Sequence, residues 1–221
     1  VHSLRVMAYR RTPSVITRLE DNRARILSAA RALVAEGGWR HAHVATVAEK
    51  AGVATGTVYR YFPSKAELFA EVLANVSRRE RDVVAAIVDG DGTPALRLRG
   101  AVKAFAKRAL QGHRLAYAMI AEPCEPEIDQ ARLVWRAALS EEFVRIVEIG
   151  QAQGGFRPCD PRIAAACVVG AFMEALVGPL TPDAFADSED AQRLIEEIAD
   201  GCVAIVSGTS VRATSSVGRT S

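Results

Sequence analysis

The sequence predicts an all-α fold of about nine helices. Apolar side chains recur at spacings of three and four through most of the 221 residues, and no stretch alternates apolar and polar residues for long enough to form a strand. Glycines, prolines and capping pairs separate these periodic segments at helix-length intervals. A hydrophobic content of 49% and a charged content of 24% are ordinary for a chain with a buried core.

Three helices are expected near the N-terminus. The first carries an apolar stripe over residues 19–34, and Thr17 and Glu20 have the spacing of a capping box at its start. The pair Gly37-Gly38 is expected to end it. The next two helices are expected over 44–51, broken by Gly52, and over 55–62, ended by Pro63.

The other six helices are delimited by equally local signals. Ser64 and Glu67 form a capping box that opens a fourth helix running to Val88. Thr93 and Pro94 open the fifth, with Thr as cap and Pro in the first turn. The remaining four are expected over about 113–121, 128–153, 160–178 and 188–206.

Charge is distributed unevenly along the chain. Residues 1–65 contain 11 Lys and Arg against 4 Asp and Glu, whereas residues 66–221 contain 17 against 22. A basic N-terminal segment followed by an acidic remainder indicates that residues 1–65 bind a polyanion, although a solvated basic surface would have the same composition.

Several function classes lack support in the sequence. The four cysteines form no CxxC pair, which argues against a zinc site or a disulfide framework. No nucleophile elbow, HExxH motif or phosphate-cradling glycine loop is present. No apolar run reaches membrane-spanning length, and no signal segment opens the chain. We therefore expect a cytoplasmic protein that is not an enzyme and has no cofactor, no metal and no membrane partner.

Residues 43–62, HVATVAEKAGVATGTVYRYF, have the pattern of a helix, a tight turn and a second helix. At about 100° per residue, inward Val58 and Phe62 leave a second-helix face that points outward. Hydroxyls, an arginine and a glycine on that face suit contact with a DNA major groove. The outward residues are Gly56, Thr57, Tyr59 and Arg60, with Thr55 and Tyr61 on the flanks.

The stretch from Leu19 to Val76 resembles the TetR family of bacterial transcriptional regulators. The matching pieces are Gly38-Trp39, Val47-Ala48-Glu49-Lys50-Ala51-Gly52-Val53, Gly56-Thr57-Val58-Tyr59-Arg60-Tyr61-Phe62 and Ser64-Lys65-Ala66-Glu67-Leu68-Phe69. The resemblance implies a homodimer of two-domain protomers that binds operator DNA with its first three helices and an effector in its C-terminal domain.

The candidate DNA contacts combine the outward face with neighbouring positions. Lys65, in the first turn of the fourth helix, is a natural phosphate anchor. The family usually has Ser or Thr where this chain has His43, so either His43 or the backbone alone would make the corresponding contact. The full candidate set is His43, Val44, Thr46, Thr55, Gly56, Thr57, Tyr59, Arg60, Tyr61 and Lys65.

Aromatic and sulfur-containing side chains of the C-terminal part are candidates for the effector site or for plain core. Glu174 is unusual because its carboxylate lies in an apolar run. It would bind a ligand group, pair with an arginine across a dimer interface, or reach solvent. The candidate set is Phe105, Tyr117, Trp135, Phe143, Phe172, Met173 and Glu174.

The predicted organisation has four parts: a flexible basic arm over 1–16, a helix-turn-helix domain over 17–65, an effector-binding and dimerisation domain over 66–207, and a disordered tail over 208–221. Small residues in the helices over about 160–178 and 188–206 favour close packing. By resemblance this pair forms the dimer interface, and a purely intramolecular core is the alternative.

The leading hypothesis is a repressor released from a palindromic operator by a small, largely apolar effector. The first alternative is a helical small-molecule-binding or catalytic protein whose DNA-binding motif is vestigial. The second is an architectural DNA binder that has no ligand.

Overall fold

The computed structural model describes residues 13–181, 184 and 188–208. Within these residues every regular element is a helix, and the expected all-α class is confirmed. The order is α1 (Pro13–His41), α2 (Val44–Ala51), α3 (Thr55–Tyr61), α4 (Lys65–Val88), α5 (Pro94–Gln111), α6 (His113–Ile120), α7 (Pro126–Ala152), α8 (Pro161–Val177) and α9 (Ser188–Ser207). The expected tail, apart from Gly208, and most of the expected arm lie outside the described residues.

The first helix begins earlier than predicted, and it is interrupted at Gly38, where its end was expected. It begins at Pro13, a residue well suited to a first helical turn, so Thr17 lies inside the helix and does not cap it. Residues 13–16, which were expected to be part of the arm, are therefore helical. Gly38 interrupts the helix with a φ of 74°, and one further turn ends at His41.

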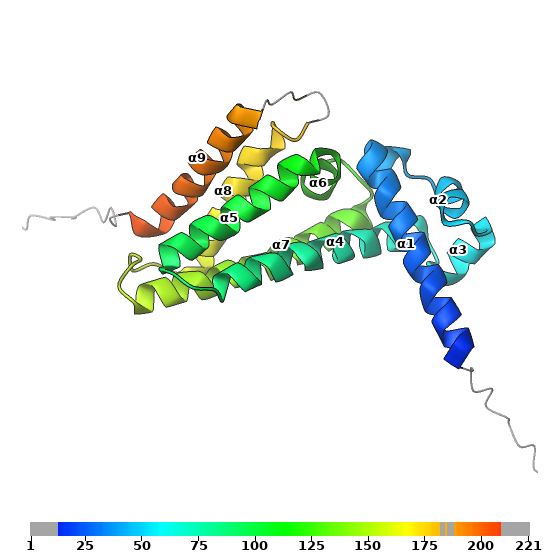
Figure 1. Ribbon diagram of the computed structural model, residues 1–221, viewed down its shortest axis with the longest axis horizontal. Helices are drawn as coiled ribbons and strands as arrows, with labels where there is room; N and C mark the ends of the chain where they lie inside the picture. Colours follow the sequence, from blue (N-terminus) through cyan, green and yellow to red (C-terminus); the bar gives the residue numbers. More distant parts are fainter. Residues whose placement is uncertain (1–12, 182–183, 185–187, 209–221) are drawn as a thin grey trace, which may run out of the picture.

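Helices α1, α2 and α3 form a small unit at one end of the molecule, around a common apolar core (Figure 1). Ile26 and Val34 of α1 are fully buried, as are Val47 of α2 and Val58 of α3. Trp39, just after the Gly38 kink, packs edge-on against Phe69 of α4, with ring centroids 5.5 Å apart. The short α2 and α3 are thus fixed by packing against longer helices.

The larger unit is built on α4 and α7, which pack along each other (Figure 1). Helix α5 covers them, and α8 and α9 pack together on the side away from the small unit. Phe172 links the layers, because its ring centroid lies 4.9 Å from that of Phe105 and 5.6 Å from that of Phe143.

The predicted caps of the larger unit are present. The Ser64 hydroxyl accepts a hydrogen bond from the Glu67 backbone N–H at 3.0 Å, and the Thr93 hydroxyl accepts one from Leu96 at 3.3 Å. Helix α4 is continuous across residues 65–88, so it belongs to both units.

Candidate nucleic-acid interface and internal cavity

The turn between α2 and α3 is held from two sides. Gly52 has a φ of 65° and caps α2 with its backbone N–H, as the sequence pattern predicts. The Arg25 guanidinium of α1 donates hydrogen bonds to the carbonyls of Ala51 and Gly52. Sequence reasoning missed Arg25, because it lies 26 residues from its main partner and no local pattern marks it.

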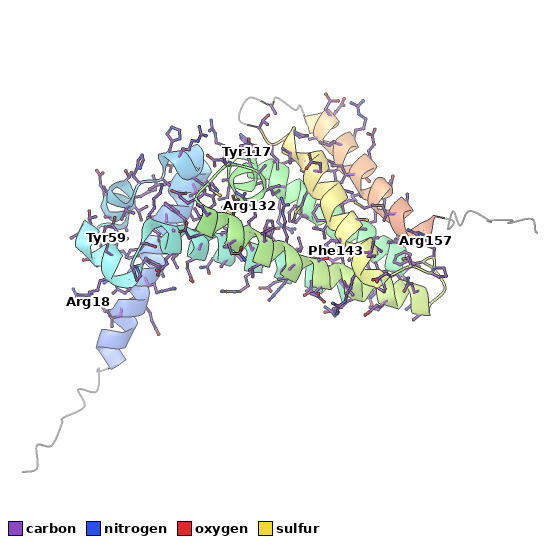
Figure 2. The ribbon with its side chains drawn as sticks, turned by 180° about the vertical axis from the view of Figure 1, so that it is seen from behind. Arg18, Tyr59, Tyr117, Arg132, Phe143 and Arg157 are labelled. Atoms are coloured by element: carbon purple, nitrogen blue, oxygen red, sulfur yellow. The ribbon has the colours of Figure 1, made fainter. Side chains whose placement is uncertain are left out.

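Helix α3 presents an open outer face. Thr55, Gly56, Tyr59 and Arg60 are exposed, and 47% of Tyr59 is accessible to solvent. Figure 2 shows Tyr59 at the outer edge of the small unit. A Cβ atom added to Gly56 would meet nothing within 4 Å, so the protein itself does not require glycine here. Glycine at this position instead leaves the backbone open to close approach by another molecule.

Other candidate contacts are less available than the sequence suggested. Val44 is buried against the core, so its side chain cannot reach DNA and only its backbone remains a candidate. Thr57 is half-buried, and the Tyr61 hydroxyl is buried without a hydrogen-bond partner among the described residues. His43 precedes α2 and makes no side-chain cap, while Thr46 is exposed on that helix. These two side chains are free to meet an external partner.

Lys65 is engaged inside the protein. Its Nζ atom lies 2.8 Å from Oε1 of Glu125, the residue preceding α7, and 5.7 Å from the centre of the Phe69 ring. Hydrogen bonding to Lys65 is the main cause that lowers the pKa of the Glu125 carboxyl below its ordinary value. The candidate phosphate anchor is therefore tied to the larger unit.

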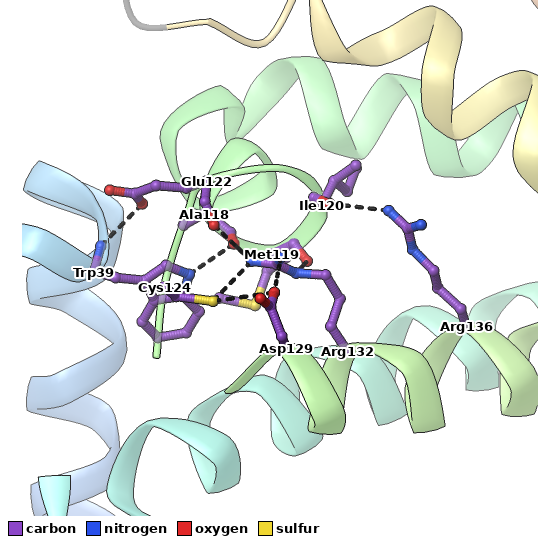
Figure 3. Close-up of polar contacts among 9 residues, drawn as sticks. All are labelled: Trp39, Ala118, Met119, Ile120, Glu122, Cys124, Asp129, Arg132 and Arg136. Atoms are coloured by element: carbon purple, nitrogen blue, oxygen red, sulfur yellow. Dashed lines mark hydrogen bonds and ion pairs between the residues drawn. The ribbon is translucent and has the colours of Figure 1, made fainter. Parts of the chain in front are cut away.

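A polar joint connects the end of α1 with the end of α6 (Figure 3). The Trp39 indole N–H donates to the Ala118 carbonyl at 2.7 Å, and the Trp39 backbone N–H donates to the Glu122 carboxylate at 2.9 Å. Arg132 of α7, which is buried, donates to the carbonyls of Ala118, Met119 and Glu122. The joint thus gives partners to carbonyls at the end of α6, where a cation is favourable.

A cavity of about 270 Å³ lies where α1, α4, α5, α6 and α7 meet. Its inner wall is apolar, with Phe105 from α5, Met119 and Ile120 from α6, and Trp135 from α7. Such a cavity, mostly apolar with a few polar groups, is typical of a small-molecule site. Because residues 113–120 form one wall, anything that fills the cavity contacts the helix that carries the polar joint.

Two of the seven candidate effector residues, Phe105 and Trp135, line this cavity. Phe143, Phe172 and Met173 are buried in the core farther along the bundle and do not line it. Tyr117 is half-buried and also lies outside the lining, and Glu174 is exposed on α8. The candidate set thus contains two residues of this cavity wall and five residues that lie outside it.

The outer faces of α8 and α9 carry small residues. On α8, Ile163 is 65% exposed, and Ala166, Cys167, Gly170 and Glu174 follow it at helical spacing on the exposed side. Gly201 and Ala204 are exposed on α9. A Cβ atom at Gly170 or Gly201 would meet nothing within 4 Å, so the fold of one protomer does not require these glycines.

Two family models match the chain. One, described as bacterial regulatory proteins of the tetR family, matches residues 26–72, and the other, described as a tetracyclin repressor-like C-terminal domain, matches residues 91–188. The chain belongs to the TetR family. The first match contains α2, α3 and the joint residue Trp39, and the second contains α5, α6, α7 and α8.

Curated relatives include TetR-family repressors named KstR. The chain is 36% identical over 118 residues to KstR of Mycobacterium tuberculosis, covering 50% of this chain and 53% of that protein. It is 39% identical over 99 residues to KstR of Mycolicibacterium smegmatis, covering 43% of this chain and 46% of that protein. The aligned regions thus span about half the length of these relatives or less.

Solved structures share the fold over most of the chain. The fatty acid degradation regulator FadR from Bacillus halodurans superposes with a TM-score of 0.72 at 21% identity, covering 88% of this chain and 96% of that one. FadR from Bacillus subtilis, solved in complex with stearoyl-CoA, gives 0.71 at 21% identity, covering 85% and 99%.

Two further kinds of feature are absent from the described residues. None of the described helices is long and apolar enough to cross a membrane. No group of three or more His, Cys, Asp or Glu in the described part of the chain has the arrangement of a metal site.

Proposed function

We propose that this TetR-family protein is a transcriptional repressor that places α3 in the major groove of operator DNA. The observation that carries the proposal is the open face of α3, where Tyr59 and Arg60 lie beside a glycine that the fold does not need. The basic character of residues 1–65 supports it, because neutralised phosphates supply much of the affinity for DNA. KstR of Mycobacterium tuberculosis, a repressor by name, is 36% identical to the chain over 118 residues.

The proposed functional unit is a homodimer formed through α8 and α9. Small exposed residues at helical spacing allow two copies of this surface to approach closely, and a two-fold axis makes one patch complementary to itself. A two-fold dimer would present two copies of α3 to the two halves of a palindromic operator, about one DNA turn or a multiple of it apart.

The proposed effector occupies the cavity between α4, α5, α6 and α7. Filling it presses on Met119 and Ile120, whose carbonyls are held by Arg132 and Arg136. Through Ala118 and Glu122, the same segment holds Trp39 and hence the end of α1. A ligand that favours another position of α6 would shift the population toward an arrangement of α2 and α3 that no longer fits the operator.

Selection of genomic DNA fragments by the purified protein, followed by sequencing, tests the proposal. We expect a palindromic site to be enriched. On that site Lys65→Ala should weaken binding and reduce the slope of log affinity against log salt by about one unit for each phosphate that Lys65 neutralises. Random fragments with no enriched motif would instead favour the alternative of a small-molecule-binding or catalytic protein whose DNA-binding motif is vestigial.

A further inference from the structure

Two residues that line the cavity beside α6 carry buried polar groups that have no partner among the described residues. Ser77 of α4 is 5% exposed and Trp135 of α7 is 6% exposed, and both line the cavity. Within the described residues, neither the Ser77 hydroxyl nor the Trp135 indole N–H has a hydrogen-bond partner. A buried polar group without a partner is costly, so two of them in one cavity wall indicate a partner that arrives with a ligand.

The chemistry of these groups limits what that partner can be. An indole N–H only donates, and a serine hydroxyl can donate as well. An oxygen acceptor such as a ketone or ester carbonyl satisfies both groups, whereas a hydrocarbon satisfies neither. The ligand therefore carries an oxygen inside an otherwise apolar surrounding that includes Phe105 and Met119.

The rim of the cavity carries cations that are not used internally. Arg31 of α1 and Arg79 of α4 line it, and neither makes an ion pair or hydrogen bond with another described residue. Arg108, on the same rim, is in contrast held by Glu80 at 2.8 Å. A second hollow of about 250 Å³ between α1 and α4 shares Arg31 and Arg79 with the cavity and provides room outside it.

We infer that the ligand is an amphipathic anion: an apolar body within the cavity, one oxygen bound by Ser77 and Trp135, and a carboxylate or phosphate held by Arg31 and Arg79. This inference rests on the proposed use of the cavity as the effector site. Because Arg31 lies on α1, the anionic end would contact the DNA-binding unit directly while the body contacts α6.

Calorimetric titration of the full chain with four probes of equal chain length tests each part. The probes are 11-oxododecanoate, dodecanoate, 2-dodecanone and dodecyl phosphate. A purely apolar cavity would bind 11-oxododecanoate about tenfold more weakly than dodecanoate, because the ketone would give up its hydrogen bonds to water. We expect 11-oxododecanoate to bind at least as tightly as dodecanoate, and the neutral ketone to bind most weakly. Comparison of dodecanoate with dodecyl phosphate identifies the preferred anion.

Variants assign the effects to residues. Ser77→Ala and Trp135→Phe should each remove the advantage of 11-oxododecanoate while leaving dodecanoate within about twofold. Arg31→Gln and Arg79→Gln should weaken both acids about tenfold and leave 2-dodecanone unchanged. Arg114→Gln is the control, since Arg114 is exposed on α6 but does not line this cavity. Thermal unfolding should show that Ser77→Ala folds normally, because its hydroxyl has no hydrogen bond to remove.

The inference is overturned if none of the anionic probes binds, if 11-oxododecanoate binds about tenfold more weakly than dodecanoate, or if Arg114→Gln weakens binding as much as Arg79→Gln. DNA binding measured without a probe separates this result from the proposed function. If the protein binds the probes as expected but binds no DNA, the ligand site stands and the proposed repressor function is wrong. If it binds DNA but none of the probes, the proposed function stands and the ligand site is wrong.

Discussion

The Lys65 ammonium lies 2.8 Å from the Glu125 carboxylate, so the cation placed best to anchor a DNA phosphate is paired with the start of α7. Both side chains remain partly exposed, at 36% and 40%. A phosphate can therefore reach Lys65 only in competition with Glu125, or by sharing it. With Lys65 as the proposed phosphate contact, the pair would make DNA affinity depend on Glu125, which immediately precedes α7.

Glu125→Gln should strengthen DNA binding. Releasing Lys65 from an exposed ion pair should raise affinity about two- to fivefold, equally on operator and random DNA, because a phosphate contact carries no sequence information. Fluorescence anisotropy on both DNAs measures this. Glu127→Gln removes the same charge from an exposed position on α7 and serves as the control. Equal gains in the two variants would show a general charge effect and no specific role for the pair.

Tyr59→Ala should reduce sequence preference. The side chain is 47% exposed at the centre of the outer face of α3, so its removal should leave folding intact and cost about 1–3 kcal/mol on the selected operator. Affinity for random DNA and the salt dependence should change little, because tyrosine carries no charge. Titrations of the variant with operator DNA and with random DNA at several salt concentrations test this prediction. An equal decrease on both would make Tyr59 a backbone contact.

Gly38→Ala and Gly56→Ala should have opposite consequences. A Cβ atom at Gly38 would overlap the Glu122 carboxylate, and its φ of 74° disfavours alanine, so we expect a decrease of about 2 kcal/mol or more in the free energy of unfolding. Gly56 has open space around it and helical neighbours, so alanine there should be neutral or stabilising but should weaken DNA binding. Thermal unfolding and anisotropy on each variant provide the comparison.

Gly170→Arg should separate the subunits without unfolding them. Within one protomer the position is exposed and a side chain would meet nothing nearby, so a monomer would accept arginine. In the proposed α8–α9 interface the same side chain would bring a charge into a closely packed surface. Sedimentation at several concentrations should show a dimeric wild type and a dissociating variant. Ala86→Arg, at an exposed position of α4, is the control. A monomeric wild type would contradict the proposed dimer.

The cysteines should differ in reactivity with pH. Burial raises the pKa of the Cys124 thiol and of the Cys202 thiol to about 11, whereas Cys167 is exposed on α8. Because the thiolate is the reactive form, brief iodoacetamide treatment at pH 8 should label Cys167 and spare Cys124 and Cys202, whose labelling should increase only as the pH approaches 11. Peptide mass spectrometry measures the labelling, and slower labelling of Cys167 at high protein concentration would support the dimer face.

Local signals predicted the helices well because they act within a few residues. Ser64 with Glu67 and Thr93 with Pro94 determine where α4 and α5 begin, and both pairs are close in sequence. Thr17 with Glu20 shows the limit of such patterns. The spacing of a capping box is present, but the helix had already begun at Pro13, and the same residues lie in its interior.

The joint and the cavity depend on contacts that no short pattern contains. Trp39 and Glu122 lie 83 residues apart, and Trp39 and Ala118 lie 79 apart. To predict the cavity, one would have to know which aromatic side chains face empty space. Sequence periodicity gives the same signal for Trp135 beside the cavity as for Phe143 in the packed core. The unpartnered state of Ser77 could not be inferred from its neighbours in α4 for the same reason.

In the proposed mechanism, helix α4 would act as a rigid arm between the cavity and the DNA-binding unit. Lys65 stands at one end and Ser77 lies 12 residues farther along, or about 18 Å at the ordinary rise of an α-helix. A tilt of about 5° around Ser77 would carry Lys65 sideways by about 1.5 Å. In a two-fold dimer the α4 helix of each subunit would tilt, so the separation of the two copies of α3 would change by up to twice that amount. An adjustment smaller than the diameter of a water molecule in the cavity would then become a mismatch at both half-sites.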